Sequence, residues 1–500
     1  MGLSSSIYLL IFLPLVASLF CQIFSKKSFG FAIAVTTCIL LLLLEVKIFW
    51  DVLVYEKISN DFELSILSLA LEFRLDILGV IFLLLFTFIK SVILFFYRCD
   101  IEESLDSSES NIFYSVFLLH LFSMVGIFTT NNLLNLFFFF EIYAFSFFAT
   151  LSITKNIEFS KISFRYFCLN SISSLLILFC ILAIYLTFNS VSFESVASDL
   201  ALIPQKDIWF ITAIFLIMAF AIVIKFFPFW LYFEKLKNTS LIASFLSIES
   251  LFIKTGIGIF VTLKFIYFFF GNKLVFSSFN AAPILIFLSM CLVFYSSIKL
   301  YNQKHLKMIS AYLCLNNLGF ILACIALQTV ESLQALFFYL LNFTLVSLPI
   351  FIFATFLKRH FATSSSIKIW LVRKDNFALV LPLKLLIFSI AAFPLTNLFF
   401  ANWYLTYASL NLGLEVFLLF GIIISNFVYI SQAVKITETF FAKENQQRLS
   451  NTKDVVVQNY NLYLISFWLL ITIIYASIMA SDLTNSISLK FASYLLSNTI

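Results

Sequence analysis

The chain has 500 residues, of which 62% are hydrophobic and only 11% are charged, and its formal net charge is +5. Soluble domains carry about 25% charged residues, so this chain cannot cover a water-exposed surface with polar groups. The composition excludes a string of soluble domains and predicts an all-α polytopic protein in which residues 1–500 form a single membrane domain.

A transmembrane helix needs about 20 apolar residues to cross the hydrocarbon core of a bilayer. On this criterion the sequence predicts fourteen spans. In chain order they cover residues 7–24, 29–49, 75–97, 112–129, 133–153, 164–188, 208–230, 240–268, 281–298, 309–327, 333–357, 376–400, 414–436 and 460–480.

Two of these spans contain a proline, Pro228 in 208–230 and Pro394 in 376–400. Proline breaks the helical hydrogen-bond ladder, and a membrane tolerates such a break where protein or water receives the freed backbone groups. Interrupted helices in corresponding parts of two halves are typical of a transport site.

The basic residues in the loops predict how the chain is oriented in the membrane. Most Lys and Arg residues outside the spans fall in the odd-numbered loops, such as Lys358–Asp375. The positive-inside rule then predicts that both termini lie outside the cytoplasm or matrix. The polar stretch 437–459 is long enough for an amphipathic helix on the membrane surface.

Several charged residues lie within the predicted spans, where a charge costs about 2.5–3.5 kcal/mol even on the mildest scale. Glu141, Lys225, Glu249 and Lys254 lie too deep, or too close to a helix break, for their charges to reach the interface. We expect Glu141 to pair with Lys225, which lies three residues before Pro228. Moving the carboxylate would then change the proton occupancy of the amine.

The other charges have simpler interpretations. Glu249 and Lys254 are five residues apart on one helix, so we expect them to face different sides and not to pair. Lys47 and Lys264 are expected to extend to the interface, and Asp76 to cap a span. For Lys90 and Lys384 an interfacial and a buried position remain open.

The histidines and cysteines do not suggest a metal site. His120, His305 and His360 are far apart, and the eight cysteines lie mostly in apolar runs without a C-x-x-C pair. This pattern argues against a disulfide framework and a thiolate site. With no nucleotide loop, haem ligands or cluster cysteines in the sequence, we expect no cofactor, no metal and no nucleic-acid partner.

Six stretches in chain order carry a family resemblance. Together they resemble the antiporter-like proton-translocating subunits shared by NADH:quinone oxidoreductase (complex I) and the multi-subunit Mrp cation/proton antiporters, with the Mrp D subunit as the nearest match. They are FRLDILGVIFLLL at 73–85, GIFTTNNLLNLFFFFEIYAFSFFATL at 126–151, IKFFPFW at 224–230, SFLSIESLFIKTGIGIF at 244–260, LKMISAYLCLNNLGF at 306–320 and AAFPLTNLFFANWYL at 391–405.

The resemblance implies two inverted five-helix repeats, about 112–268 and 281–436, with helices 7 and 12 broken. It implies that Glu141 and Lys225 form the coupling ion pair and that Lys254 is the central relay residue. Lys307, Lys384 and Glu249 are secondary candidates for the same proton relay.

The sequence departs from the family at the twelfth helix, where the family's G-K-W-Y-L motif reads A-N-W-Y-L and Asn402 replaces the lysine. We therefore predict that the second half-channel is impaired or runs through water and Asn402 itself. Lys384, in the same predicted span, is the alternative amine.

The implied function is proton movement through a buried Glu/Lys relay in a multi-subunit monovalent cation/proton antiporter. One alternative is the antiporter-like proton-pumping subunit of complex I, in which the chain would be part of an enzyme complex without being an enzyme alone. Another class of alternative is an unrelated fourteen-span exporter or flippase, or an inactive structural paralogue. The expected partners are other membrane subunits, protons, sodium or another monovalent cation, and the lipids of a bacterial or mitochondrial inner membrane.

Overall fold

The structure is a computed structural model that describes the chain except for fourteen segments. These are residues 1–2, 24–26, 56, 65–68, 154–156, 202–207, 228–240, 272–274, 277–280, 362–384, 395, 411–414, 442–480 and 498–500. The chain divides into two compact units. Unit 1 comprises Met1–Tyr232, Phe245–Phe279 and Ser497–Ile500, and unit 2 comprises Phe233–Ser244 and Asn280–Leu496.

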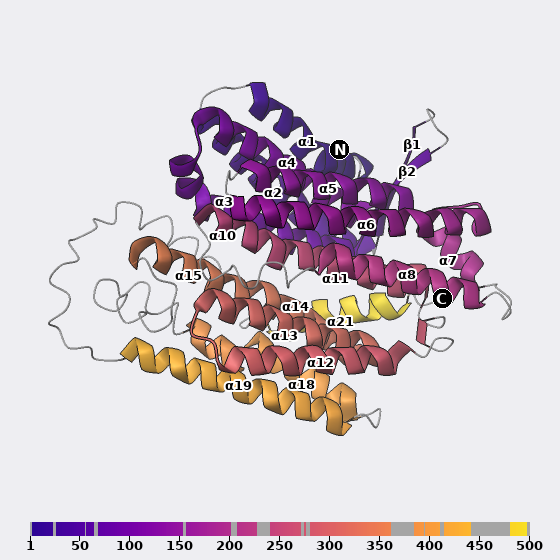
Figure 1. Ribbon diagram of the computed structural model, residues 1–500. Helices are drawn as coiled ribbons and strands as arrows, with labels where there is room; N and C mark the ends of the chain where they lie inside the picture. The colour runs from indigo at the N-terminus through magenta and orange to yellow at the C-terminus, as the bar shows by residue number, and fades with distance from the viewer. Residues whose placement is uncertain are drawn as a thin grey trace. The chain divides into compact units, whose positions relative to one another are not determined.

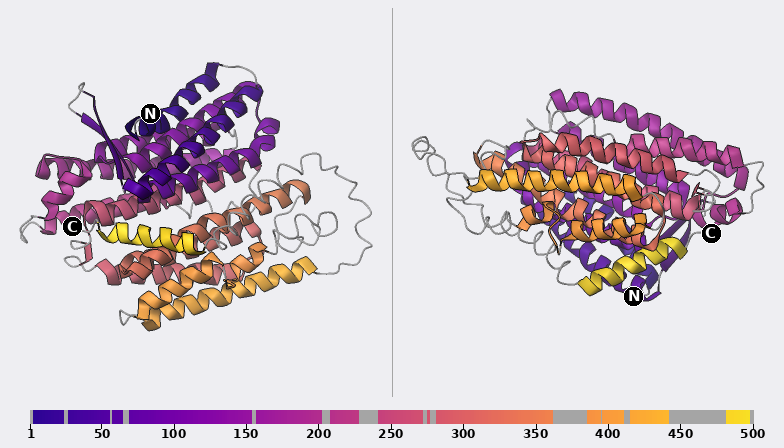
Figure 2. Two further views of the ribbon diagram at one scale, coloured as in Figure 1. Left: turned by 180° about the vertical axis from the view of Figure 1, so that it is seen from behind. Right: turned by 90° about the horizontal axis from the view of Figure 1, so that it is seen from below.

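Unit 1 is built on helices that pack along one another (Figures 1 and 2). Its centre is α4, which contacts α1, α2, α3 and α5, while α6 packs between α5 and α8, and α11 contacts α3, α4 and α8. Its elements are α1 (Leu3–Ile23), α2 (Lys27–Tyr55), β1 (Lys57–Leu64), β2 (Leu69–Asp76), α3 (Ile77–Ser104), α4 (Ser107–Thr129), α5 (Leu133–Ile153), α6 (Ile157–Phe188), α7 (Phe193–Ala201), α8 (Ile208–Phe226), η3 (Glu249–Ile253), α11 (Lys254–Leu263) and η4 (Lys264–Phe269). Helix α10 (Leu241–Ile248) is shared: its residues up to Ser244 belong to unit 2 and the rest to unit 1.

The strands β1 and β2 form an antiparallel hairpin that the hydropathy pattern did not predict, with Lys57 opposite Asp76 and Leu64 opposite Leu69. The hairpin is anchored to unit 1 at its base. Asp76 caps α3 by accepting a hydrogen bond from the Gly79 amide at 2.7 Å, which is the capping role expected for it. Figure 2 shows the hairpin standing away from the helices of this unit.

The segment between α4 and α5 is extended and held at both sides. The Asn131 amide donates to the Glu72 carbonyl of the hairpin, and the Asn131 carbonyl accepts from the Phe193 amide at the start of α7. The Asn132 side chain accepts from the Leu134 amide at 2.9 Å, in the first turn of α5. These contacts fix where α5 begins and therefore where Glu141 lies.

Unit 2 is organised around α13, which is buried along nearly its whole length and packs on α12, α14 and α15. Helix α18 packs against α14 and α19, and α21 contacts α14 through Phe491 and Phe337. The elements are α12 (Ala281–Tyr301), α13 (Leu306–Leu327), α14 (Val330–Leu345), α15 (Ser347–Phe361), α18 (Asn397–Leu410), α19 (Glu415–Phe441) and α21 (Ser481–Ser497).

The break expected at Pro394 is present. Residues 385–390 are helical, Pro394 lies in a turn, and α18 begins at Asn397. Ala392 in this turn has a φ of 52°, a left-handed conformation that a continuous helix does not contain. The other proline, Pro228, lies outside the described residues, and α8 ends two residues before it at Phe226.

Within the described part of the chain, twelve helices are long and apolar enough to span a membrane. They correspond to the first eleven predicted spans and to the thirteenth. The twelfth is described only in part and 460–480 not at all, so fourteen spans stay a prediction. The expected surface helix at 437–459 also falls largely outside the described residues.

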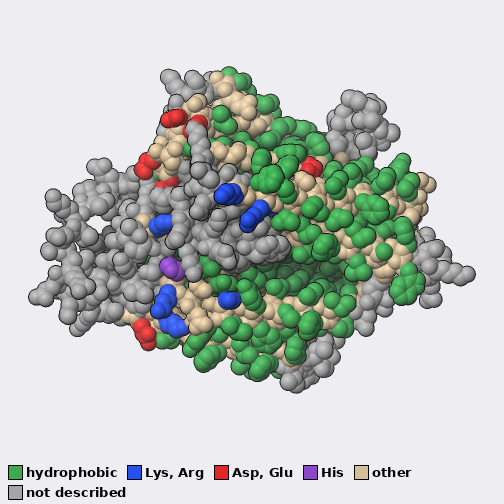
Figure 3. Space-filling view, viewed as in Figure 1, with side chains coloured by type: hydrophobic (Ala, Val, Ile, Leu, Met, Phe, Trp, Pro, Cys, Tyr) green, Lys and Arg blue, Asp and Glu red, His purple; other side chains and the backbone are tan. Residues whose placement is uncertain are grey.

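Hydrophobic side chains cover most of the described surface visible in Figure 3. Trp209, for example, is 82% exposed. Because such a surface is unfavourable in water and favourable against lipid chains, the chain is an integral membrane protein.

Candidate functional site

The ion pair between Glu141 and Lys225 joins three helices of unit 1. The Lys225 ammonium, in the last turn of α8, donates to Glu141 Oε1 at 2.9 Å and to Ser174 Oγ at 2.8 Å. Ser174 on α6 in turn donates to the same carboxylate oxygen at 2.6 Å. The sequence predicted the pair but missed Ser174, because one serine in an apolar helix carries no signal of its own.

The two partners differ in exposure. The Lys225 side chain is 2% exposed and that of Glu141 is 25% exposed. Glu141 also lines a small pocket between α5 and α6, together with Tyr166 and Asn170. The pocket measures about 40 Å³, which is room for at least one water molecule. Water can therefore reach the carboxylate but not the amine.

Lys254 is the first residue of α11 and is 1% exposed. Its Nζ makes no hydrogen bond with any described residue. Instead it lies 3.7 Å from the centre of the Tyr166 ring and 5.8 Å from that of Phe147, the geometry of a cation–π contact. Tyr166 also lines the Glu141 pocket, so the same ring lies beside both Lys254 and the carboxylate of the ion pair.

The helix carrying Lys254 contains a π-helical turn immediately before it. The Lys254 amide bonds to the Glu249 carbonyl five residues earlier, instead of four residues earlier as in an α-helix. Such π turns are rare and occur frequently at functional sites. As expected, Glu249 does not pair with Lys254.

Glu249 pairs with Lys90 and His120 instead. Lys90 on α3 lies 3.3 Å from one carboxylate oxygen, and His120 Nδ1 on α4 lies 3.5 Å from the other. Lys90 Nζ is 2.8 Å from the same His120 nitrogen. Lys90 is 0% exposed, so of the interfacial and the buried position left open for it, the structure shows the buried one. The sequence did not point to His120.

Lys264 and Glu45 are two further buried charged residues of unit 1. Lys264 is 3% exposed and donates to the Thr130 backbone carbonyl. This carbonyl lies between α4 and α5, so the Lys264 ammonium is held by a backbone acceptor at the end of two spans and not by solvent. Glu45 on α2 is 1% exposed and accepts a hydrogen bond from Thr87. Lys47, in contrast, is exposed as expected.

Unit 2 has a different interior. Among its described residues, Lys307 is the one buried charged side chain, and it donates to Ser244 Oγ at 2.6 Å. Asn402 on α18 accepts from the Tyr339 hydroxyl at 2.6 Å and donates to Asn426 Oδ1 at 2.9 Å. Lys384 lies outside the described residues.

A second neutral network in unit 2 surrounds Asn316 on α13. Its amide donates to Ser296 and Ser297 of α12 at 3.0 and 2.9 Å, and its oxygen accepts from the Tyr429 hydroxyl at 2.9 Å. These groups can hold and orient water, but no member of the network changes charge readily at neutral pH.

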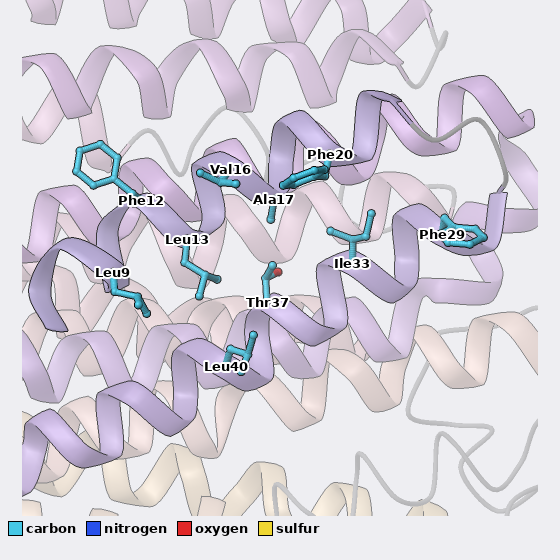
Figure 4. A pocket seen from close by; sticks show the side chains of 10 residues that line it. All are labelled: Leu9, Phe12, Leu13, Val16, Ala17, Phe20, Phe29, Ile33, Thr37 and Leu40. Carbon is cyan, nitrogen blue, oxygen red and sulfur yellow. The ribbon is translucent and has the colours of Figure 1, made fainter. Parts of the chain in front are cut away.

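The described residues contain no group of three or more His, Cys, Asp or Glu side chains placed to hold a metal ion. A larger pocket lies between α1 and α2, where Figure 4 shows Leu13 and Thr37 pointing into the space between the helices. Its lining is almost wholly apolar, so it offers no group for proton chemistry.

Comparison with known proteins shows which family the chain resembles. Residues 130–428 match the family model described as NADH:quinone oxidoreductase/Mrp antiporter, TM. NADH-quinone oxidoreductase subunit N of Wolbachia is 23% identical over 68% of this chain and 72% of its own length. A putative antiporter subunit mnhD2 of Staphylococcus saprophyticus is 25% identical over 70% of this chain and 68% of its own length.

Solved structures show the same fold. A chain of the Mrp complex from Dietzia superimposes with a TM-score of 0.81 at 15% identity, covering 99% of this chain and 98% of that one. A chain of respiratory complex I from Thermus thermophilus gives 0.74 at 18% identity, covering 98% and 99%. With the family model matched across both units, this chain belongs to the family of antiporter-like membrane subunits found in NADH:quinone oxidoreductase and Mrp antiporters.

Proposed function

We propose that this chain is a proton-carrying subunit of a multi-subunit monovalent cation/proton antiporter and that Glu141, Lys225 and Lys254 carry the protons. The observation that supports this most directly is the Glu141–Lys225 pair itself. A buried amine keeps its positive charge where a carboxylate lies within hydrogen-bond distance. Here Lys225 Nζ lies 2.9 Å from Glu141 Oε1.

The mechanism follows from the unequal exposure of the two partners. When Glu141 turns toward its pocket, the Lys225 ammonium loses its counter-charge and becomes a proton donor. The proton leaves Lys225 Nζ and forms a new N–H bond on the neutral amine of Lys254. The positive charge moves with the proton to Lys254 Nζ, where the face of the Tyr166 ring stabilises it. Return of Glu141 to a reprotonated Lys225 resets the pair.

The second candidate is the antiporter-like subunit of NADH:quinone oxidoreductase. The specific observation in its favour is the match to subunit N of Wolbachia over 68% of the chain. In either complex the remaining membrane subunits are the partners, and a bacterial or organellar inner membrane is the location.

Inside-out vesicles carrying the complete complex separate the candidates. A proton gradient is first formed by succinate oxidation, and sodium, potassium or lithium is then added while a pH-sensitive dye reports the gradient. Antiport predicts a cation-dependent loss of the gradient that the Glu141→Ala variant abolishes. Membership of complex I predicts instead that Glu141→Ala abolishes gradient formation driven by NADH. If Glu141→Ala changes neither signal, the chain is an exporter or an inactive paralogue and the proposal is wrong.

A further inference from the structure

Unit 1 contains a second cluster of titratable groups that the Glu141–Lys225–Lys254 relay does not use. Lys90, His120 and Glu249 come from α3, α4 and η3, and their side chains are 0%, 3% and 2% exposed. Burying three such groups together is unfavourable unless they compensate one another. Compensation alone, however, requires only a lysine and a carboxylate. Charge compensation therefore does not explain why His120 is part of the cluster.

The contact between Lys90 and His120 allows two arrangements of one proton. A lysine ammonium has no lone pair and can only donate, whereas a neutral imidazole nitrogen can accept. At 2.8 Å, either the Lys90 ammonium donates to a neutral ring or an imidazolium Nδ1–H donates to a neutral lysine amine. Glu249 lies within 3.5 Å of both nitrogens, so its negative charge balances the positive charge in either arrangement.

The second ring nitrogen of His120, Nε2, is the atom from which a proton can leave the cluster. His120 Nε2 is buried and makes no hydrogen bond with any described residue. The ring packs on Tyr143, with centres 4.1 Å apart, and on Phe147, with centres 6.1 Å apart. Phe147 is also the ring whose centre lies 5.8 Å from Lys254 Nζ. Phe147 thus contacts both His120 and the central lysine of the relay.

We propose that Lys90, His120 and Glu249 form a proton reservoir that exchanges with Lys254 past Phe147. When the reservoir discharges, the proton shared by Lys90 and His120 moves onto Nδ1 and the Nε2 proton leaves for the Lys254 amine. The cluster loses one positive charge and Lys254 gains one. A proton returning to Nε2 restores the cluster by the reverse steps. This inference rests on the proposed function, because it assumes that Lys254 takes up and releases protons.

The π-helical turn lies in the helix that carries residues of both the reservoir and the relay. The turn lies between Glu249 and Lys254, the two members of the reservoir and the relay that share a helix. Among the described residues, unit 2 buries one charged side chain, whereas unit 1 buries both clusters.

Transport measurements test the reservoir with variants that keep the net charge. His120→Gln removes the titrating ring, and the double variant Lys90→Met/Glu249→Gln removes both charges of the pair, so that no single buried charge is left behind. The matched control is Arg98→Gln/Glu102→Gln, which removes a half-exposed ion pair from the same helix α3. We expect both cluster variants to lower proton transport at least tenfold and the control to remain within twofold of wild type.

Nuclear magnetic resonance supplies a readout that a structural role would not change. The chain has three histidines, so ¹⁵N-histidine labelling of the full chain in lipid nanodiscs gives three rings, and His120→Gln assigns one. We expect the unprotonated nitrogen of the resting His120 ring to be Nδ1. We further expect Lys254→Met to change the exchange rate of the Nε2 proton while Lys307→Met does not.

The outcomes separate the two proposals. If Glu141→Ala abolishes transport while His120→Gln and the double variant retain it, the reservoir is refuted and the proposed function stands. If Glu141→Ala itself leaves transport intact, the proposed function fails. If the exchange rate of the His120 Nε2 proton is the same in Lys254→Met as in the wild type, the reservoir is refuted independently of transport.

Discussion

Removing the Ser174 hydroxyl should weaken proton transport by a measurable but incomplete amount. Ser174→Ala takes away the hydrogen bond from Lys225 at 2.8 Å and the hydrogen bond to Glu141 at 2.6 Å, while the direct contact at 2.9 Å between the two charges remains. A hydrogen bond to a charged group contributes about 1.5–3 kcal/mol. Because Glu141 is 25% exposed, water can replace part of the loss, and the low end of that range applies.

A loss of about 1.5 kcal/mol corresponds to about a tenfold change in the equilibrium between the paired and separated states. Glu141→Ala is more severe, because an unpaired buried charge costs about 3–5 kcal/mol. We therefore expect Ser174→Ala to reduce proton transport about tenfold and Glu141→Ala to reduce it at least a hundredfold. The control is Ser152→Ala on α5, whose hydroxyl donates to the Ala149 carbonyl at an exposed position.

The assay is the loss of a preformed proton gradient in inside-out vesicles, normalised to the amount of the chain in the membrane. Transport at the wild-type rate in Ser174→Ala, with Glu141→Ala inactive, would show that the ion pair works without the serine. A Ser152→Ala variant as slow as Ser174→Ala would show that the effect comes from helix packing.

Three further outcomes are expected. A cysteine introduced by Ser365→Cys should react with membrane-impermeant reagents only from the cytoplasmic or matrix side, and labelling from outside refutes the orientation. Asn402→Lys should raise proton-coupled transport, measured as the initial rate of gradient loss, and an unchanged rate contradicts the impaired half-channel. Gly256→Ala should destabilise the chain by about 1–3 kcal/mol, because its Cβ would lie 1.8 Å from the buried Phe86 ring. In Gly421→Ala the added Cβ would lie 2.8 Å from the flexible end of Met290 and at ordinary contact distance, 3.9 Å, from Val293, so the thermal unfolding temperature should remain nearly unchanged.

Hydropathy predicted the spans because lipid selects against charge along about 20 residues at a time. It could not predict the β1–β2 hairpin or α7, since both lie outside the apolar runs and depend on contacts with each other. Arg74 of the hairpin, for example, pairs with Glu194 of α7, and their sequence separation is 120 residues.

Charged residues in apolar spans were informative for a related reason. A charge in a membrane helix needs a partner, so Glu141 and Lys225 could be matched from their places in the sequence. Ser174 could not, because a serine in an apolar span carries no signal of its own, and His120 could not, because nothing in the sequence places it beside Lys90 or Glu249. Only the packing of α6 on α5 and of α3 on α4 brings these residues to the charges they contact.

The departure at Asn402 is matched by its surroundings. An ammonium at this position would need a carboxylate or several acceptors to offset its desolvation, and the described neighbours are the Tyr339 hydroxyl and the Asn426 amide. Both are neutral, and each already uses Asn402 as a hydrogen-bond partner. The amide of Asn402 donates and accepts at once, which a lysine cannot do. Asn402→Lys therefore loses these two hydrogen bonds, but it also gains an amine that no described carboxylate holds in its charged form. Such an amine can take up and release a proton, which is why the variant is expected to raise proton-coupled transport.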